Sequence, residues 1–250
     1  MSTEGPLWPE GFDRIVLDEI DSTNAEAARL APGLVRPTWI LAKRQTNGRG
    51  RRGRIWHNPE GNFAATLLMR PGGAAQEAAL RSFLAANALF ETLAMLTERT
   101  RLATKWPNDV LLDGGKVAGI LLESTGRSGE VDWLSIGIGV NLKTSPMPDP
   151  EAAFLPVALA EQGIEAPSPE QFLEVLAGHY ATEEAIFGRL GFLPIREAWL
   201  RHAAKLGEVI TARTAREEMT GTFETVDEVG NLVLKTAKGR SVIAAADVYF

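Results

Sequence analysis

The 250-residue sequence contains no cysteine, which excludes disulfide bonds, thiolate metal sites and cysteine nucleophiles. Its three histidines, His57, His179 and His202, are too scattered to indicate a histidine-rich metal site. There is also no run of about 18 apolar residues, and no basic segment followed by an apolar one at the start of the chain. Neither a membrane span nor a signal peptide is indicated, so we expect a cytoplasmic protein without membrane association.

The chain has no excess of positive charge. It carries 26 basic and 32 acidic residues, a net charge of -6, which argues against general nucleic-acid binding although a local basic patch could still matter. Apolar residues make up 45% of the sequence and charged residues 23%. A chain of this length and composition can bury a full core, most simply as one larger domain and a small one.

Strand and helix patterns alternate along most of the chain, and turn residues separate them. Asp113, Gly114 and Gly115 tolerate the positive φ of a tight hairpin turn between two short apolar runs. The strands expected in this part are 14–20, 38–43, 62–69, 109–112, 116–122 and 131–141. The helices expected are 25–30, 76–98, 151–161, 169–188 and 194–204.

From about residue 206 the residue pattern changes to short segments rich in Val, Ile and Thr. The strands expected there are 207–213, 219–226, 231–235 and 240–244. We therefore predict an α+β fold, in which residues 1–205 form a larger domain of strands and helices and residues 206–250 form a small β-barrel.

The segment Lys43 to Arg54 places six cations in an otherwise acidic chain. Gly48, Gly50 and Gly53 allow its backbone N–H groups to approach one point, as in phosphate-binding nests. Arginine adds charge-assisted bonds to phosphate oxygens. A nucleotide phosphate is the ligand that this pattern favours, and a flexible basic loop or an RNA-contacting arm are the alternatives.

A second polar cluster, Lys105-Trp106-Pro107-Asn108-Asp109, precedes the expected hairpin, and Lys116 and Gly119 follow on its returning strand. If the hairpin folds back, two cations, an amide and a carboxylate could meet at its mouth and form an active-site wall. The alternative is a surface turn with solvated charges. The run 137–141, GIGVN, closes an apolar strand, and its glycines would allow a ligand or a neighbouring backbone to come close.

Taken in order, these segments resemble those of the biotin–protein ligases over most of the chain. The matching segments are Ser22-Thr23-Asn24, Gln45, GRGRRGR at 48–54, Trp56, KWPND at 105–109, KVAGILLE at 116–123 and GIGVN at 137–141. The resemblance implies a mixed-sheet catalytic domain like that of class II synthetases, followed by an SH3-like barrel.

The resemblance also implies which residues bind each substrate. The biotin-binding set would be Ser22, Thr23, Asn24, Gln45, Gly48, Arg49, Gly50, Lys116, Gly119, Gly137 and Gly139. The ATP- and adenylate-binding set would be Arg51, Arg52, Arg54, Trp56, Asn108, Lys116 and Asn141. The catalytic set would be Lys116, Arg51, Asp109 and Asn108, with Asn62 and Lys105 nearby.

The implied reaction joins biotin and ATP into biotinyl-5′-AMP with release of pyrophosphate, and then transfers biotin to a lysine of a biotin carboxyl carrier protein. Mg²⁺ is implied as well, but the sequence identifies no ligands for it. Asp109 is a candidate to deprotonate the carrier lysine. It could equally position Asn108 or Lys116 while the leaving phosphate or solvent takes the proton.

Family members that repress transcription carry an N-terminal winged helix of several dozen residues, whereas 13 residues precede the first expected strand here. We therefore expect a monofunctional enzyme without specific DNA binding. The sequence is compatible with either a monomer or a homodimer. The nearest rival is a ligase or transferase for lipoate or octanoate, which has a related fold. The alternative from a different functional class is a non-catalytic RNA-binding module.

Overall fold

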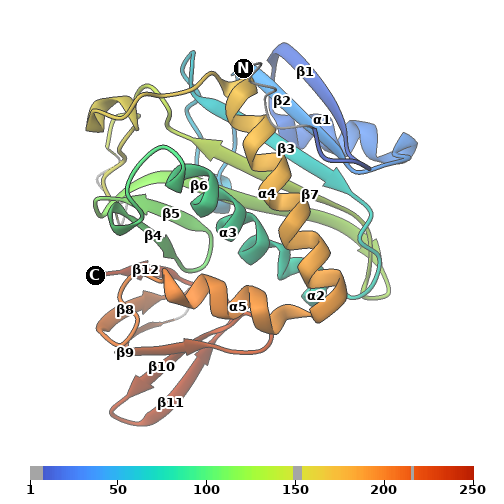
Figure 1. The fold of residues 1–250 in the computed structure, drawn as a ribbon. Helices are drawn as coiled ribbons and strands as arrows, with labels where there is room; N and C mark the ends of the chain where they lie inside the picture. Colours follow the sequence, from blue (N-terminus) through green and yellow to red (C-terminus); the bar gives the residue numbers. More distant parts are fainter. Residues whose placement is uncertain (1–7, 149–153, 215–216) are drawn as a thin grey trace.

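The computed structural model describes residues 8–148, 154–214 and 217–250 (Figure 1). The helices are α1 (Thr23–Leu30), α2 (Ala75–Ala79), α3 (Arg81–Ala94), α4 (Pro169–Leu190) and α5 (Phe192–Arg201). The strands of the N-terminal part are β1 (Asp13–Ile20), β2 (Thr38–Gln45), β3 (Phe63–Met69), β4 (Leu102–Lys105), β5 (Asp109–Leu112), β6 (Gly115–Arg127) and β7 (Glu130–Val140). Those of the C-terminal part are β8 (Val209–Arg213), β9 (Glu218–Val226), β10 (Leu232–Thr236), β11 (Gly239–Ile243) and β12 (Asp247–Tyr249).

The N-terminal strands form one seven-stranded mixed sheet in the order β1-β2-β3-β7-β6-β5-β4. β1 and β2 run parallel, and every other pair of neighbours is antiparallel. The turn between β5 and β6 has positive φ at Asp113 (49°) and Gly114 (79°), as a tight hairpin turn requires. The predicted mixed sheet is confirmed, and so is the predicted hairpin of β5 and β6.

Helices lie on both faces of this sheet. α3 and α4 lie across one face, where Trp39 and Leu67 belong to the main core (Figure 1). α1 packs on the other face, against Ile40 and Leu68. Because side chains alternate along a strand, positions 64, 66 and 68 of β3 share the α1 face. The part of this face that α1 leaves uncovered is the floor of the cavity described below.

The C-terminal strands form a five-stranded antiparallel sheet in the order β11-β10-β9-β8-β12, which confirms the predicted C-terminal β domain. One hydrophobic core continues from the first sheet into the second. Trp199 of α5 and Phe223 of β9 meet there with ring centroids 6.5 Å apart. Trp106, which is 3% exposed, donates from Nε1 to Gly230 O at 3.0 Å and so joins the KWPND segment to the C-terminal sheet.

Two helix predictions were wrong. The expected helix 76–98 is divided at Leu80, where N–H groups bond three residues back, and α3 ends at Ala94. Of the expected helix 151–161, residues 151–153 lie outside the described residues and 154–159 are not helical. Pro156 cannot donate a helical hydrogen bond, and the backbone on either side of it pairs with Lys116 instead. The short strands β4 and β12 were not predicted.

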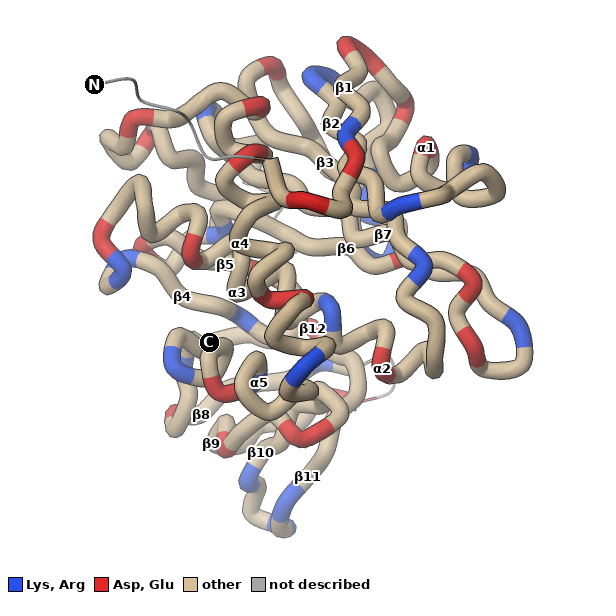
Figure 2. Tube along the Cα trace, turned by 45° about the vertical axis from the view of Figure 1, so that its right-hand side comes forward, with Lys and Arg blue, Asp and Glu red and all other residues tan. Residues whose placement is uncertain are grey.

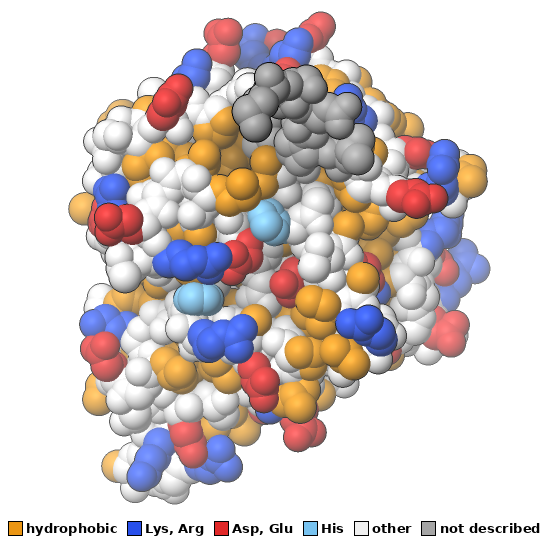
Figure 3. Space-filling view, in the orientation of Figure 1, with side chains coloured by type: hydrophobic (Ala, Val, Ile, Leu, Met, Phe, Trp, Pro, Cys, Tyr) orange, Lys and Arg blue, Asp and Glu red, His pale blue; other side chains and the backbone are white. Residues whose placement is uncertain are grey.

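Charge is spread over the molecule. Basic and acidic residues are scattered along the whole trace in Figure 2. On the face shown in Figure 3, they are interspersed with apolar side chains and form no large patch of one sign. Among the described helices, none is both long and apolar enough to cross a bilayer.

Candidate active site

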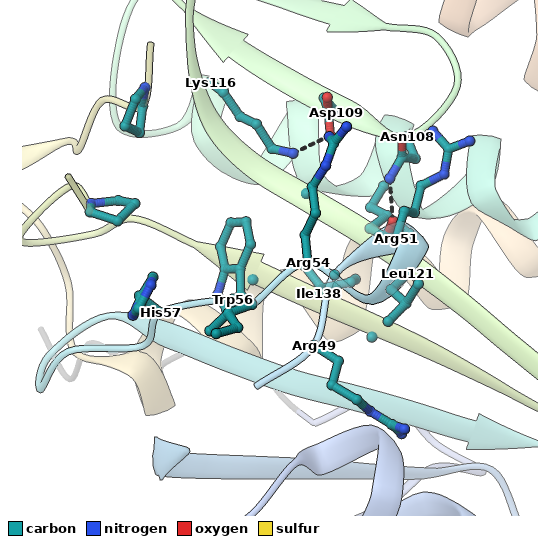
Figure 4. Close-up of a pocket in the computed structure, with 18 of the residues that line it drawn as sticks. Arg49, Arg51, Arg54, Trp56, His57, Asn108, Asp109, Lys116, Leu121 and Ile138 are labelled. Atoms are coloured by element: carbon teal, nitrogen blue, oxygen red, sulfur yellow. Dashed lines mark hydrogen bonds and ion pairs between the residues drawn. The ribbon is translucent and has the colours of Figure 1, made fainter. Parts of the chain in front are cut away.

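A cavity of about 600 Å³ lies on the α1 face of the sheet, beneath the arginine-rich segment that follows β2 (Figure 4). Most of the residues singled out from the sequence line it. They are Ser22, Thr23, Asn24, Gln45, Arg49, Gly50, Arg51, Arg54, Trp56, Lys105, Asn108, Asp109, Lys116, Gly119, Gly137, Gly139 and Asn141. The structure therefore brings together four segments that are separate in the sequence: 22–24, 45–56, 105–119 and 137–141.

Three predicted site residues do not line this cavity. Gly48 holds the segment together: its carbonyl accepts from Trp56 N at 2.9 Å, and a Cβ at this position would lie 2.5 Å from Trp56 O. Asn62 is buried, and its side chain bonds to the backbone of residues 143 and 144. Arg52 bonds to Asp247 of the C-terminal sheet at 2.7 Å.

The N-terminus of α1 provides an end of the cavity lined mainly by hydroxyl and amide groups, beside the Arg49–Glu123 ion pair. Thr23 donates to Gln45 Oε1 from both its backbone N (2.8 Å) and its Oγ1 (3.1 Å). Asn24 donates to Glu123 Oε2 at 2.8 Å and accepts from Thr66 Oγ1 at 2.6 Å. Ser22 Oγ makes no hydrogen bond among the described residues. Its hydroxyl and the Gln45 amide nitrogen are therefore the groups that can meet a small polar ligand here.

Asp109 lies between two lysines at the other end of the cavity. Lys116 Nζ is 2.8 Å from Oδ1 of this carboxylate, and Lys105 Nζ is 3.5 Å from Oδ2. Burial alone would raise the pKa of Asp109, but the charges of Lys116 and Lys105 outweigh it and hold the pKa below its ordinary value. Burial also lowers the pKa of Lys105, which is 5% exposed. The predicted convergence of these residues is confirmed.

Arg51 enters the same end of the cavity from the arginine-rich segment. Its Nη1 donates to Asn108 Oδ1 at 3.1 Å, and Asn108 Nδ2 donates to Ile120 O at 2.5 Å (Figure 4). Burial lowers the pKa of the Arg51 guanidinium, which nevertheless stays charged at neutral pH. Three cations, Arg51, Lys105 and Lys116, therefore surround the single carboxylate of Asp109. These cations could balance the negative charge of a polyanion bound at this end of the cavity.

Trp56 packs directly on the glycines of β6 and β7. A Cβ at Gly139 would lie 2.3 Å from Trp56 Cε2, and a Cβ at Gly137 would lie 2.2 Å from Asn24 Oδ1. The sequence predicted that these glycines leave backbone room beside the ligand. In the structure they leave room for protein side chains, which in turn face the cavity. A Cβ at Gly119 would meet Lys116 Nζ at 3.3 Å and Trp56 at 3.4 Å, so this position is less crowded than the other two.

Several residues of the cavity were missed by sequence reasoning. They are Ile55, His57, Ala64, Ile120, Leu121, Ile138, Pro146, Met147, Phe154, Pro156, Asp247 and Tyr249. The apolar members of β3, β6 and β7 carry the ordinary pattern of core strands, so no local signal sets them apart. Asp247 and Tyr249 come from the last strand of the chain, which sequence analysis did not recognise as a strand.

Residues 16–141 match the model of the biotin/lipoate A/B protein ligase family, and residues 205–250 match the biotin protein ligase C-terminal domain. The chain is 51% identical over 240 residues to a biotin–[acetyl-CoA-carboxylase] ligase of Paracoccus denitrificans, a match that covers 94% of this chain and 99% of that relative. The chain belongs to the biotin protein ligase family. The C-terminal match agrees with the second sheet, which the family shares.

More distant members of the biotin protein ligase family are also similar. A bifunctional ligase/repressor of Bacillus subtilis is 32% identical over 247 residues, covering 95% of this chain and 74% of that protein. The structure of the Aquifex aeolicus biotin protein ligase in complex with biotin and ATP superposes with a TM-score of 0.78 at 25% identity, covering 94% of this chain and 98% of that chain. The fold predicted from the resemblance is thus confirmed.

Proposed function

We propose that this protein is a biotin–protein ligase, which forms biotinyl-5′-AMP from biotin and ATP and transfers the biotin to a lysine of a biotin carboxyl carrier protein. The observation that supports this most is the division of one cavity into an end beside α1 that is lined mainly by hydroxyl and amide groups and a cationic end around Asp109. Biotin has a neutral polar head and a carboxylate at the opposite end of its chain. The 51% identical relative carries the name of the same activity.

In the proposed complex, the ureido head of biotin binds Ser22 and Gln45 beside Thr23, and its tail crosses the apolar floor formed by Leu121 and Ala64. The carboxylate then reaches Lys116. Arg51 and Arg54 bind the phosphates, while Trp56 packs on adenine. Asn141 supports this assignment, since its Nδ2 is bonded to Val157 O whereas its buried Oδ1 has no partner among the described residues and can accept from the adenine amino group.

In the first step, a biotin carboxylate oxygen attacks the α-phosphorus of ATP, and the bond to the bridging oxygen of the β-phosphate breaks, which releases pyrophosphate. Two anions must approach each other for this to occur. Lys116 and Arg51 are already placed by Asp109 and Asn108, so they can offset the charge without rearranging. Such preorganised donors are usually the largest single contribution to catalysis.

Mg²⁺ is expected to arrive bound to ATP, as part of the substrate. The described residues contain no group of three His, Asp or Glu side chains that could hold a metal. Asp109 and Asp247, the carboxylates of the cavity, are both paired with cations. The donor set therefore fits a metal held mainly by phosphate oxygens and water, which in that position would neutralise phosphate charge.

In the second step, the amine of the carrier lysine attacks the acyl carbon of the mixed anhydride, the bond to the phosphate oxygen breaks, and AMP leaves with loss of one proton from the amine. Asp109 has a lowered pKa and two cationic partners, which make it a weak proton acceptor. We therefore favour Asp109 as a positioning residue for Lys116. The leaving phosphate or solvent then takes the proton.

The carrier is the partner that the activity requires, and we propose the cytoplasm, where ATP and carboxylases meet, as the compartment. Absence of specific DNA binding and formation of a homodimer stay predictions. The family model that matches residues 16–141 includes lipoate enzymes. The polar groups around Ser22 favour biotin over lipoate, because a lipoyl ring has no ureido group to satisfy them.

The test is to incubate the purified protein with biotin and MgATP, to follow pyrophosphate release, and then to measure labelling of an added biotin carrier domain. Biotin-dependent release with carrier labelling is expected. Release with lipoate or octanoate, but not with biotin, would move the assignment to the rival acyltransferases. Retention on RNA at moderate salt without either half-reaction would favour the binding module.

A further inference from the structure

We propose that Asp247, in the last strand of the C-terminal sheet, is a positioning residue that holds Arg52 and Arg54 beside the cavity until the nucleotide phosphates replace it. The inference rests on the proposed function for the role of the two arginines. It deepens that function by giving the C-terminal sheet a specific part in the site.

One carboxylate oxygen receives both arginines. Arg52 Nη1 lies 2.7 Å and Arg54 Nη2 lies 3.1 Å from Asp247 Oδ2. The Asp247 side chain is 14% exposed, whereas those of the arginines are 42% and 50% exposed. Asp247 also lines the cavity. The half-exposed arginines therefore converge on a largely buried anion at the cavity wall, as they would on a phosphate.

The arginine-rich segment needs such a counter-ion. Arg51, Arg52 and Arg54 repel one another, and Arg52 adopts φ 57°, a left-handed conformation that residues other than glycine adopt at a cost. The backbone bonds made by residues 50–54 stay within that stretch. In the described part of the chain, the side-chain hydrogen bonds that residues 50–54 make to the rest of the protein are those to Asp247 and the one from Arg51 to Asn108. Arg49, just before them, bonds to Glu123.

Asp247 itself is fixed to the catalytic part of the molecule. It belongs to β12, which pairs with β8 in the C-terminal sheet. That sheet is joined to the KWPND segment by the bond from Trp106 Nε1 to Gly230 O, 3.0 Å long. The carboxylate thus reaches the arginines from a rigid element, which is what precise placement of a site requires.

A triphosphate competes successfully with this single carboxylate, because it carries more negative charge and accepts bidentate bonds from each guanidinium. Asp247 therefore acts on the protein before ATP arrives. It keeps the segment folded over the cavity, so that the segment loses less conformational entropy when the nucleotide binds.

Limited trypsin digestion of the full-length protein without ligands tests this directly, since trypsin cuts after arginine. Cleavage after Arg51, Arg52 and Arg54 is expected to be about fivefold faster in Asp247→Asn than in the parent, because cutting follows the population of the open segment. Asp247→Glu should restore most of the protection. The control Glu224→Gln, which removes a carboxylate paired with Arg240 elsewhere in the same sheet, should digest like the parent.

Equal cleavage of the segment in Asp247→Asn and the parent would overturn the proposal. Faster cleavage after Lys235 and Arg240 as well, with a lower Tm, would also overturn it, because the role would then be general stability of the C-terminal sheet. Biotin with MgATP should restore protection in Asp247→Asn. If the ligands protect neither protein while the variant still opens faster, the proposed function fails and the role of Asp247 stands.

Discussion

The Lys116 ammonium lies 2.8 Å from Asp109 Oδ1, in an ion pair whose Asp109 side chain is 11% exposed. This pair places the cation at the cavity before any substrate is present. A charge that is already in position costs no reorganisation when an anion forms beside it. The β5–β6 hairpin, whose packing sets the position of this pair, is therefore expected to contribute to the rate of adenylation.

Lys116→Ala should leave the fold intact and retain much of the biotin affinity, but lower the rate of biotin-dependent pyrophosphate release by about 100-fold or more. The missing charge acts mainly on the phosphate as it gains negative charge. Calorimetric biotin titration and a pyrophosphate assay separate the two effects. Lys238→Ala, at an exposed turn, is the matched control. Unchanged turnover in Lys116→Ala would contradict the assigned role.

Asp109→Asn should lower the free energy of unfolding by about 3 kcal/mol at pH 7, because it leaves buried Lys105 without its counter-ion. The folded-state pKa of Asp109 lies below its ordinary 3.8. The stability that the ionised group contributes is therefore present above pH 3.8 and is lost as the pH falls through the lowered pKa. Urea unfolding at decreasing pH should show the difference between parent and variant shrinking below pH 3.8. A difference independent of pH would mean that packing, not charge, is responsible.

Gly139→Ala should weaken biotin binding by about tenfold, because the new Cβ overlaps Trp56 at 2.3 Å and forces the indole into the cavity. Combined with Trp56→Ala, the substitution should cost much less than it does alone, since the overlap is gone. Gly178→Ala, in α4 with nothing within 4 Å of the added Cβ, is the control and should bind biotin normally. Additive losses in the double variant would show that Trp56 is not the obstacle.

Arg51→Ala should release biotinyl-5′-AMP faster than the parent, by about tenfold, because a charge-assisted bond to the phosphate is lost. Release is measured by trapping the adenylate after rapid dilution. Arg44→Ala is the control, since Arg44 pairs with Glu19 and does not line the cavity. If the adenylate leaves both variants at the same rate, the phosphate is held by other cations.

Local patterns in the sequence identified every strand of the central sheet except β4, together with the Asp113-Gly114 turn, the arginine-rich segment and the polar KWPND cluster. These features depend on residue periodicity and on backbone conformations that few residue types adopt, so a short stretch of sequence is enough to reveal them. The motifs alone also indicate the family. The individual substrate contacts stay predictions, as does the division of the chain at residues 205 and 206, across which one hydrophobic core continues.

Only the tertiary structure decided which distant segments meet. Arg52 and Asp247 are 195 residues apart in the sequence and share a hydrogen bond of 2.7 Å. Lys116 pairs with the backbone beside Pro156, where helical periodicity predicts a helix. Gly137 and Gly139 accommodate Asn24 and Trp56. Such contacts depend on the packing free energy of the whole chain, which overrides local propensity and leaves no trace in the pattern of neighbouring residues.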